Sequence, residues 1–346
     1  MKRLNWGIIG LGEIAQKFSE GFFETQNAKL IAISSKNSKK LEKFKGRFGI
    51  EQKFTYNNYE DLINCKEVDI VYIALPNSLH CKWIIEALNS KKNVLVEKPA
   101  TLNFVEVKKI EEVLHKKNLF FSEAFMYRYH PKIKLVLDLI NNNEIGNLFS
   151  MESSFGVNIL SKKKFFIFNK KKKIDTNNRL FNKTLGGGCI LDLGCYPSSF
   201  SLLIASLINK LNYKNLKISK ISREIGNMGV EVDSYGELLF EDGFISKIRS
   251  SFKNNLGKKT VINGDNGSII IDDTWLGEGG IIKINTDNKF KKIINTERNK
   301  NIYSYQISSI SKNILEGINK PEYPGMSLKE TVLNMKILEE WINGQK

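Results

Sequence analysis

The chain has 346 residues, and its 53 Lys and Arg against 37 Asp and Glu give a formal charge of +16 at pH 7. A hydrophobic share of 41% and only six prolines exclude a disordered or collagen-like chain, and the length suggests two domains. The four cysteines lack metal-ligand spacing and are too sparse for a disulfide framework, so we expect a cytoplasmic protein without a metal site.

The positive charge alone does not predict a nucleic-acid-binding protein. Only seven of the 53 basic residues are arginine, the lysines are scattered, and no nucleic-acid-binding module is recognisable. Two lysine runs, Lys162–Lys164 and Lys170–Lys173, flank Phe165–Phe168 and form either a solvated loop or a groove for an anionic substrate. No apolar run approaches the roughly 20 residues of a membrane helix, so we expect neither nucleic acid nor a membrane as a partner.

The first third of the chain alternates short apolar runs with amphipathic stretches, which is typical of a parallel sheet covered by helices. The predicted strands are Asn5–Ile9, Leu30–Ser34, Ile70–Ala74, Asn93–Glu97 and Leu119–Ser122. The predicted helices are Glu13–Phe23, Lys39–Phe48, Leu79–Asn89 and Phe104–Lys116. This α/β order predicts a Rossmann domain, a doubly wound parallel sheet, over residues 1–122.

From residue 123 the pattern changes to that of an α+β domain with a large mixed, mostly antiparallel open sheet. We expect a helix over residues 131–141, a strand over 149–155 and a glycine-initiated segment over 186–208. Alternating strands follow over residues 218–225, 230–240, 245–252, 259–263 and 268–272. Helices are predicted over 304–317 and 327–343, and the last one is a candidate to pack back on the Rossmann domain.

A glycine-rich turn follows the first predicted strand. Gly10, Gly12 and Ala15 form a G-x-G-x-x-A pattern that also contains Glu13 and Ile14. Glycines at these positions let the backbone approach a pyrophosphate, which binds the N–H groups at the start of the next helix. Its place between a strand and a helix at the start of a βαβ series favours dinucleotide binding over an ordinary turn.

The second strand ends in Ser34, Ser35, Lys36 and Asn37, where an NAD enzyme would place an acidic residue against the ribose 2′-hydroxyl. A small hydroxyl followed by a cation suits a 2′-phosphate instead, so Ser35 and Lys36 favour NADP over NAD. The alternative is that Lys36 points into water, since a lysine is a weaker signal for phosphate than an arginine.

Two further segments lie at the carboxyl ends of predicted strands, where open parallel sheets bind their ligands. They are Leu75-Pro76-Asn77-Ser78-Leu79-His80 and Glu97-Lys98-Pro99. Lys98 would lie beside the nicotinamide, where a cation polarises a carbonyl or holds a hydroxyl. Proline after it would fix the chain, and a cis bond is one way to do so; an exposed turn is the alternative.

The run from Gly186 to Pro197 contains Asp192 and Tyr196, four residues apart. On a helix they share one face, so the phenol can exchange a proton with a substrate oxygen. Pro197 conflicts with a regular helix because it cannot donate to residue 193, and we expect a kink or a restart there.

These motifs occur in the order of the Gfo/Idh/MocA oxidoreductases, and the resemblance covers nearly the entire chain. The segments concerned are Gly10–Ala15, Pro76–His80, Glu97–Pro99, Glu123–Pro131 and Gly186–Tyr196. The chain is most similar to the branch with glucose–fructose oxidoreductase, NADP-dependent xylose dehydrogenases and dimeric dihydrodiol dehydrogenases. Many relatives have His in place of Tyr196, so the tyrosine is a feature of this branch.

The resemblance implies roles for individual residues. Lys98, Asp192 and Tyr196 would be catalytic, and the nicotinamide side would be lined by Pro76, Asn77, His80 and Glu97. Arg128 would lie near the floor of the active site. Arg179 would meet a substrate oxygen or, equally well, form a structural ion pair. A homodimer or homotetramer through the second-domain sheet is also implied.

We therefore expect an NADP(H)-dependent oxidoreductase that acts on a hydroxyl or carbonyl of a sugar or related cyclic polyol. Two alternatives stay open at this point. One is a ketoreductase acting on a nucleotide-linked keto sugar, favoured only by the lysine-flanked loop. The other, from a different class, is a sensor that binds a dinucleotide without chemistry, against which the presence of both Lys98 and Tyr196 argues.

Overall fold

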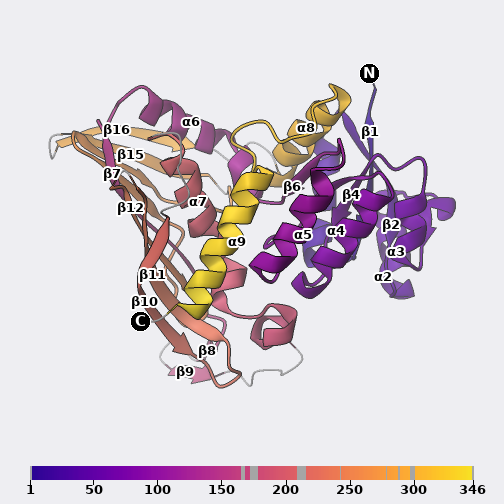
Figure 1. The fold of residues 1–346 in the computed structure, drawn as a ribbon, viewed down its shortest axis with the longest axis horizontal. Coiled ribbons are helices and arrows are strands. Elements are labelled where there is room, and N and C mark those ends of the chain that lie inside the picture. Colours follow the sequence, from indigo (N-terminus) through magenta and orange to yellow (C-terminus); the bar gives the residue numbers. More distant parts are fainter. Residues whose placement is uncertain are drawn as a thin grey trace. The chain divides into compact units, whose positions relative to one another are not determined.

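The computed structural model describes residues 2–164, 168–171, 178–208, 216–241, 243–277, 279–286, 289–296 and 301–344, and Figure 1 shows its elements. The chain divides into two compact units. The first contains Met1–His130 and Asn299–Val332, and the second contains Pro131–Arg298 and Leu333–Lys346. The chain therefore returns to the first unit after the second has begun, which a single boundary at residue 122 does not describe.

The first unit is built on a six-stranded parallel sheet in the order β3-β2-β1-β4-β5-β6. The strands are β1 (Leu4–Ile9), β2 (Ala28–Ser34), β3 (Thr55–Tyr56), β4 (Ile70–Ile73), β5 (Asn93–Val96) and β6 (Phe121–Glu123). The predicted Rossmann fold is confirmed, because the strand order reverses between β1 and β4, which is the topological switch point of this fold. The edge strand β3 was not expected, since two residues are too few to show an alternating pattern.

The helices of the first unit are α1 (Glu13–Glu20), α2 (Ser38–Phe48), α3 (Tyr59–Asn64), α4 (His80–Asn89), α5 (Phe104–Leu114) and α8 (Ile302–Leu315). Short 3-10 turns lie at Gly21–Glu24, Gln52–Phe54, Asn77–Leu79 and Met126–Tyr129. Asn37, Asn58 and Asn103 begin α2, α3 and α5, and each side chain accepts the N–H three residues later. These caps satisfy N–H groups that the first helical turn leaves unpaired. The six-residue helix α3 is another element that the periodicity did not reveal.

The buried Trp6 on β1 joins the two chain segments of the first unit. Its indole nitrogen donates to Ser311 Oγ on α8 over 2.9 Å, and its ring packs against Phe18 and Phe22. Asn27 donates from its side chain to Ser308 O over 2.9 Å. Helix α8 is thus part of the first unit's core although it follows the whole second sheet in the sequence.

The second unit contains an eight-stranded sheet in the order β10-β11-β12-β7-β13-β14-β15-β16. The strands are β7 (Leu148–Gly156), β10 (Lys217–Ile225), β11 (Glu231–Leu239), β12 (Ile245–Ser251), β13 (Thr260–Gly264), β14 (Gly267–Ile271), β15 (Gly280–Thr286) and β16 (Lys289–Thr296). Among the strand pairs of this sheet that the structure describes, only β7–β12 is parallel, so the predicted mixed, mostly antiparallel sheet is confirmed. Strands β15 and β16 were not predicted. A separate hairpin joins β8 (Ser161–Lys164) and β9 (Phe168–Lys171).

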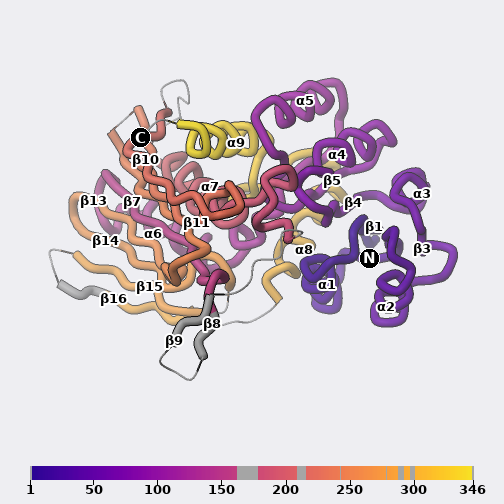
Figure 2. The backbone as a smooth tube through the Cα atoms, turned by 90° about the horizontal axis from the view of Figure 1, so that it is seen from below, coloured from indigo at the N-terminus to yellow at the C-terminus, as the bar shows by residue number. Residues whose placement is uncertain are grey.

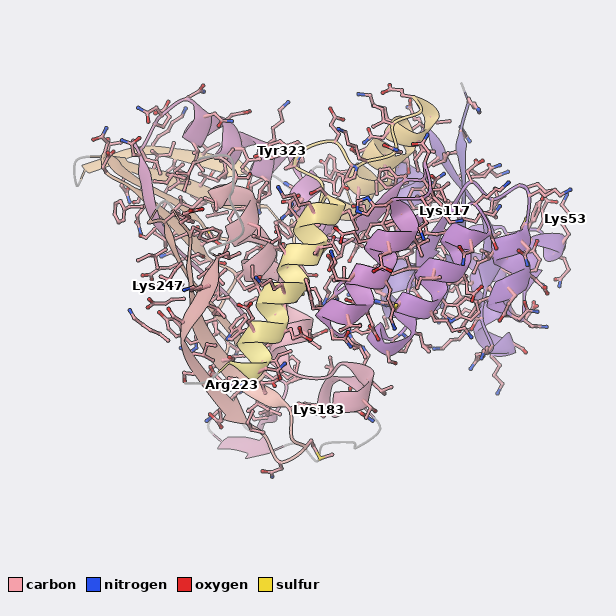
Figure 3. All side chains as sticks on the ribbon, in the orientation of Figure 1. Lys53, Lys117, Lys183, Arg223, Lys247 and Tyr323 are labelled. Atoms are coloured by element: carbon pink, nitrogen blue, oxygen red, sulfur yellow. The ribbon has the colours of Figure 1, made fainter. Side chains whose placement is uncertain are left out.

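Alternation along the strands gives this sheet one buried and one open face. On β12, Ser246, Ile248 and Ser250 are buried, whereas Lys247 and Arg249 lie on the open face. Ion pairs cross between strands on that face, including Lys247 with Glu152 at 2.6 Å and Arg249 with Asp233 at 3.1 Å. Figure 3 shows Lys247 on the outer side of the sheet. A one-sided core of this kind is ordinary for an antiparallel sheet.

The buried face is covered by α7 (Cys195–Ala205), which packs against β7 and β12 (Figure 2). The unit also contains α6 (Pro131–Asn141), 3-10 turns at Arg179–Phe181 and Lys183–Leu185, and a π-helical turn at Ile190–Gly194. The last helix, α9 (Leu328–Asn343), begins in the first unit and ends in the second. In the second unit, the buried Trp341 of α9 donates its indole N–H to Tyr235 O over 3.1 Å.

One helical stretch is long and apolar, although the sequence led us to expect no membrane helix. Residues 183–205, which include the helical segments Lys183–Leu185, Ile190–Gly194 and Cys195–Ala205, are long and apolar enough, by length and composition, to cross a membrane. The sequence showed no such length because glycines and serines interrupt its apolar residues. Within this stretch 94% of the most apolar window is buried inside the protein, which is the environment of a core helix.

We expect Trp6→Ala to destabilise the first unit by about 3–5 kcal/mol, because it leaves a cavity and removes the link to Ser311. Urea unfolding followed by far-UV circular dichroism measures the change in unfolding free energy. Val105→Ala is the matched control, since Val105 is 63% exposed and its truncation should cost less than about 0.5 kcal/mol. Equal losses in the two variants would contradict the placement of α8 in this core.

Candidate active site

The glycine turn lies at the carboxyl end of β1, beside the end of β4. Gly10 has φ +89°, and a Cβ on it would lie 2.5 Å from Ala74 O and 2.8 Å from Leu75 Cδ2. Its N–H donates to Ser34 O over 3.0 Å, so the ends of β1, β2 and β4 meet here. Only glycine fits at this position, because both the backbone angle and the space exclude a side chain.

Gly12 differs from Gly10 because the fold itself does not require it. A Cβ at Gly12 would meet nothing within 4 Å, and the residue is the N-cap of α1 in extended conformation. Glu13 and Ile14 follow in the first turn of α1. The turn therefore leaves open space in front of a helix N-terminus, which is what a pyrophosphate needs.

The end of β2 presents one buried hydroxyl and one exposed cation. The Ser35 amide donates to Tyr56 O over 3.2 Å, and Ser35 Oγ accepts the Asn37 N–H over 3.1 Å. The Lys36 side chain is exposed, with its ammonium 5.8 Å from the centre of the Tyr59 ring. The described strand end carries no acidic residue, so an anionic group can approach Lys36 without repulsion.

His80, which we expected beside the nicotinamide, is fully buried and contacts backbone on both sides. Its Nδ1 lies 2.9 Å from Pro99 O, and its Nε2 lies 2.8 Å from Leu75 O. A carbonyl oxygen only accepts hydrogen bonds, so a neutral imidazole donates to one of the two carbonyls and only the imidazolium donates to both. His80 thus joins the segments that follow β4 and β5. Pro76 and Asn77 begin the short turn between Leu75 and His80, and Asn77 is buried.

Lys98 follows the end of β5, and the Lys98–Pro99 peptide bond is cis. The Lys98 side chain is half-buried between buried neighbours. Glu97 is buried and accepts a hydrogen bond from the hydroxyl of the fully buried Tyr72. A role of Glu97 beside the nicotinamide stays a prediction. The hydrogen bond from Tyr72 on β4 also fixes Glu97, and with it the end of β5.

Arg128 is buried, and its guanidinium pairs within the first unit. Its Nη1 lies 2.7 Å from Glu330 Oε1 and also donates to Pro324 O over 3.3 Å. Glu330 Oε2 in turn accepts from the backbone and hydroxyl of Ser327, just before α9 begins. Arg128 therefore anchors the start of α9; a position on the active-site floor stays a prediction.

The second unit brings two of the expected residues together. Arg179 donates to Asp192 Oδ1 from both terminal nitrogens, over 3.3 and 3.4 Å. The Asp192 side chain is 14% exposed and that of Arg179 is 47% exposed. Of the two readings left open for Arg179, the structure supports the ion pair. An exposed guanidinium in such a pair still has donors for a substrate oxygen.

Tyr196 lies in the first turn of α7, directly after the π-helical turn that contains Asp192. Its ring packs edge-on against Phe155, with centroids 5.2 Å apart, and lies 5.9 Å from Trp275. Pro197 causes no kink inside the helix, because α7 begins at Cys195 and the first turn has no N–H to lose. A π-helical turn of this kind is frequent at functional sites.

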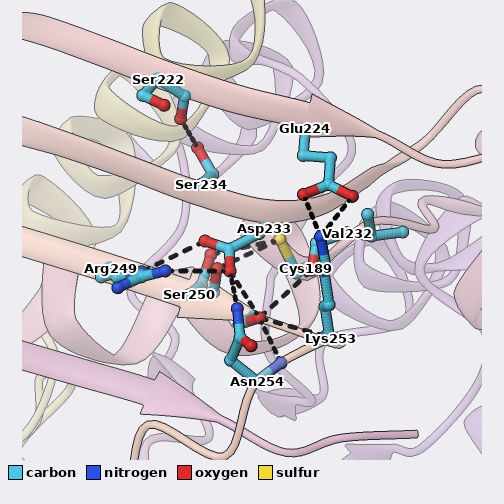
Figure 4. Close-up of polar contacts among 11 residues, drawn as sticks. Cys189, Ser222, Glu224, Val232, Asp233, Ser234, Arg249, Ser250, Lys253 and Asn254 are labelled. Carbon is cyan, nitrogen blue, oxygen red and sulfur yellow. Dashed lines mark hydrogen bonds and ion pairs between the residues drawn. The ribbon is translucent and has the colours of Figure 1, made fainter. Parts of the chain in front are cut away.

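The glycine run before Asp192 packs against β11. A Cβ on Gly188, which has φ +112°, would lie 2.3 Å from Glu231 Oε2. Cys189 donates to Ser250 O over 3.5 Å next to the Asp233 network on the sheet (Figure 4), and burial raises the pKa of its thiol to about 12. A thiol of this kind is inert. The part of the chain that the structure describes contains no cluster of metal ligands.

The first lysine run, 162–164, lies on β8, and only the backbone of this run is described. Lys172 and Lys173 of the second run fall outside the described residues. A groove for an anionic substrate at these lysines therefore stays a prediction.

Comparison with known proteins identifies the family. Residues 4–125 match the oxidoreductase family model described as "NAD-binding Rossmann fold", and residues 133–270 match the GFO/IDH/MocA C-terminal domain. Oxidoreductase P35 of Formosa agariphila is 30% identical over 77% of this chain and 78% of its own length. An NADP-dependent D-xylose 1-dehydrogenase of Hypocrea jecorina is 34% identical over 56% of this chain and 51% of its own.

The fold also matches a solved structure over nearly its full length. A 3-ketoreductase from Actinomadura kijaniata, in complex with NADP and TDP-benzene, superimposes with a TM-score of 0.81 at 20% identity. The match covers 98% of this chain and 97% of that one. Both family models and the 30% identical relative agree with the motif order in the sequence, and the chain belongs to the GFO/IDH/MocA family of oxidoreductases.

Proposed function

We propose that this oxidoreductase uses NADP(H) to transfer a hydride to or from a hydroxyl or carbonyl of a sugar or related cyclic polyol. The observation that carries the proposal is the glycine turn at the β1–β4 switch, with Lys98 following the end of the neighbouring β5. Dinucleotides bind at this edge of open parallel sheets. Two of the similar proteins named above support this proposal. The relative from Hypocrea jecorina is an NADP-dependent dehydrogenase of the sugar D-xylose. The structure from Actinomadura kijaniata is a 3-ketoreductase in complex with NADP.

The residues of the first unit fit a bound NADP. Gly10 brings the backbone close, and Gly12 leaves the space that a pyrophosphate would fill at the start of α1. Ser35 and Lys36 would hold the 2′-phosphate, and Pro76 and Asn77 would lie toward the nicotinamide. When bound, the nicotinamide accepts or supplies the hydride.

Side chains of the protein transfer the proton of the substrate hydroxyl. In oxidation, Tyr196 accepts the proton of the substrate hydroxyl, and in reduction it returns one. A tyrosine is a poor base near neutral pH because its ordinary pKa is about 10. The Lys98 ammonium stabilises the phenolate and the developing alkoxide, since an opposite charge favours the ionised form. Asp192 is held by Arg179, and this pair offers a carboxylate and a guanidinium to further substrate hydroxyls.

A second candidate within the enzyme class is reduction of a keto sugar linked to a nucleotide. The similarity to a 3-ketoreductase solved with TDP-benzene favours it, because a nucleotide portion is bound in that protein. A non-catalytic sensor would bind the dinucleotide and show no turnover. We further propose a cytoplasmic homodimer or homotetramer formed through the open sheet face of the second unit.

Gly12→Leu is expected to abolish NADP binding without changing the stability of the free protein, because its side chain enters open space in front of α1. Thermal unfolding with and without NADP measures both quantities, since a ligand of the folded state raises the melting temperature. Gly46→Leu is the control: its Cβ position is also open, and it lies inside α2. Gly10→Ala should instead lower the melting temperature without ligand. A normal NADP shift in Gly12→Leu would contradict the assignment of the turn.

Lys36→Glu is expected to weaken NADP binding by about ten- to a hundredfold, the equivalent of a lost charge-assisted hydrogen bond. NAD binding should hardly change, because NAD has no 2′-phosphate. Isothermal titration with each dinucleotide gives the two dissociation constants, and Lys116→Glu, at an exposed lysine after α5, controls for the change in net charge. Equal affinities of the unaltered protein for NAD and NADP would refute the preference.

Tyr196→Phe and Lys98→Met should each keep NADP binding and lose turnover by at least about a hundredfold, as expected when a proton-transferring group is removed. Turnover is followed by nicotinamide absorbance with aldoses, cyclic polyols and nucleotide-linked keto sugars as substrates. Activity near that of the unaltered protein in either variant would contradict proton transfer by Tyr196 with the support of Lys98. Binding without turnover of any substrate, even by the unaltered protein, would favour the sensor.

A further inference from the structure

Glu123, the last residue of β6, is a fully buried carboxyl group to which the mechanism above assigns no task. One oxygen, Oε1, accepts the N–H of Ala100 over 3.0 Å. The other, Oε2, is buried and has no hydrogen-bond partner of ordinary geometry within the described part of the chain. A buried carboxylate that is only half satisfied needs a positive charge close by.

The hydrogen bond from Ala100 joins Glu123 to the segment that carries Lys98. Ala100 N–H and Pro99 C=O belong to the same peptide group, which begins one residue after Lys98. His80 holds the carbonyl side of this group over 2.9 Å, and Glu123 holds the amide side over 3.0 Å. The buried side chains of His80 and Glu123 therefore both contact the peptide group that follows Lys98.

The charges around Glu123 alternate in sign. Glu330 pairs with Arg128, and the charges of Arg128 and Lys98 both favour the ionised form of Glu123. Burial is the larger effect and raises the pKa of Glu123 to about 7, whereas the Ala100 N–H, the Thr331 side chain and these two cations lower it. Arg128 pairs with Glu330, and Lys98 is the second cation whose charge acts on Glu123.

We propose that Glu123 is the positioning residue for Lys98: its carboxylate fixes the Ala100 N–H and supplies the negative charge that keeps Lys98 an ammonium ion. This proposal depends on the proposed function in one respect, which is that Lys98 is taken to be catalytic. Above about pH 7 the carboxylate is ionised and keeps Lys98 charged, whereas below it the carboxyl is neutral and the electrostatic support is lost.

Charge coupling can be measured without knowing the substrate. Competitive labelling of the full-length protein with trace acetic anhydride, read by mass spectrometry between pH 6 and 11, gives the midpoint at which Lys98 becomes reactive. Glu123→Gln keeps an oxygen for Ala100 but removes the charge, so we expect this midpoint to fall by about one pH unit. Exposed Lys116 is the internal reference in every sample.

Glu106→Gln is the matched control variant. Glu106 also accepts a backbone N–H of the same segment, that of Leu102, over 2.9 Å. If a carboxylate only braced the backbone, the two glutamine variants would behave alike. We expect no change in the Lys98 midpoint for Glu106→Gln, and an unchanged midpoint in Glu123→Gln would overturn the proposal.

A second variant, Glu123→Asp, tests the geometry of the contact separately from its charge. It also provides a test if Glu123→Gln fails to fold. Glu123→Asp keeps the charge but is shorter, so residue-resolved hydrogen exchange should show faster exchange of the Ala100 amide while the Lys98 midpoint stays. Unchanged exchange of that amide would refute the positioning contact.

Turnover distinguishes this inference from the proposed function. Glu123→Gln should lower kcat by up to about tenfold at pH values above both Lys98 midpoints, with KM for NADP unchanged, because a midpoint lower by one pH unit leaves about a tenth as much Lys98 charged there. Loss of turnover in Lys98→Met with an unmoved Lys98 midpoint in Glu123→Gln would defeat the inference alone. A moved midpoint with full turnover in Lys98→Met would defeat the proposed function and leave the coupling in place.

Discussion

The parallel direction of the first sheet is the constraint on which its functional residues depend. Because every strand runs the same way, the segments after β1, β2, β4, β5 and β6 all emerge at one edge. The glycine turn, Lys36, Lys98 and Glu123 each follow or end one of these strands. Residues separated by more than a hundred positions in the sequence thus reach the same edge without any long loop.

Several motif residues of this edge support backbone rather than expose a functional group. His80 bridges two carbonyl oxygens, Glu97 accepts from Tyr72, and Arg128 pairs with Glu330. All three are buried, where an unpaired polar group is costly. Motif residues of a family can therefore position the backbone around a ligand without contacting the ligand themselves.

The sequence was sufficient to predict the Rossmann fold, the glycine turn and the mixed sheet, because periodicity and turn residues report local structure directly. It did not predict β3 or α3, which are too short to show a period, or the strands β15 and β16. The partners of Arg128 and Arg179 were equally hidden, since Glu330 lies 202 residues away and Asp192 lies beyond a glycine run. The importance of Glu123 depends on its burial beside Ala100, and no spacing in the sequence carries that information.

The discontinuous first unit has a consequence for how the protein is made. Strand β1 leaves the ribosome first, but Ser311, the hydrogen-bond partner of Trp6, is synthesised about 300 residues later. At usual rates of translation, on the order of 10 residues per second, the first sheet waits roughly half a minute for α8 to cover it. During that interval the apolar face around Trp6 is open to chaperones and to other nascent chains. The second sheet is synthesised within the same interval, so folding in order of synthesis would complete the second sheet before α8 completes the core of the first unit.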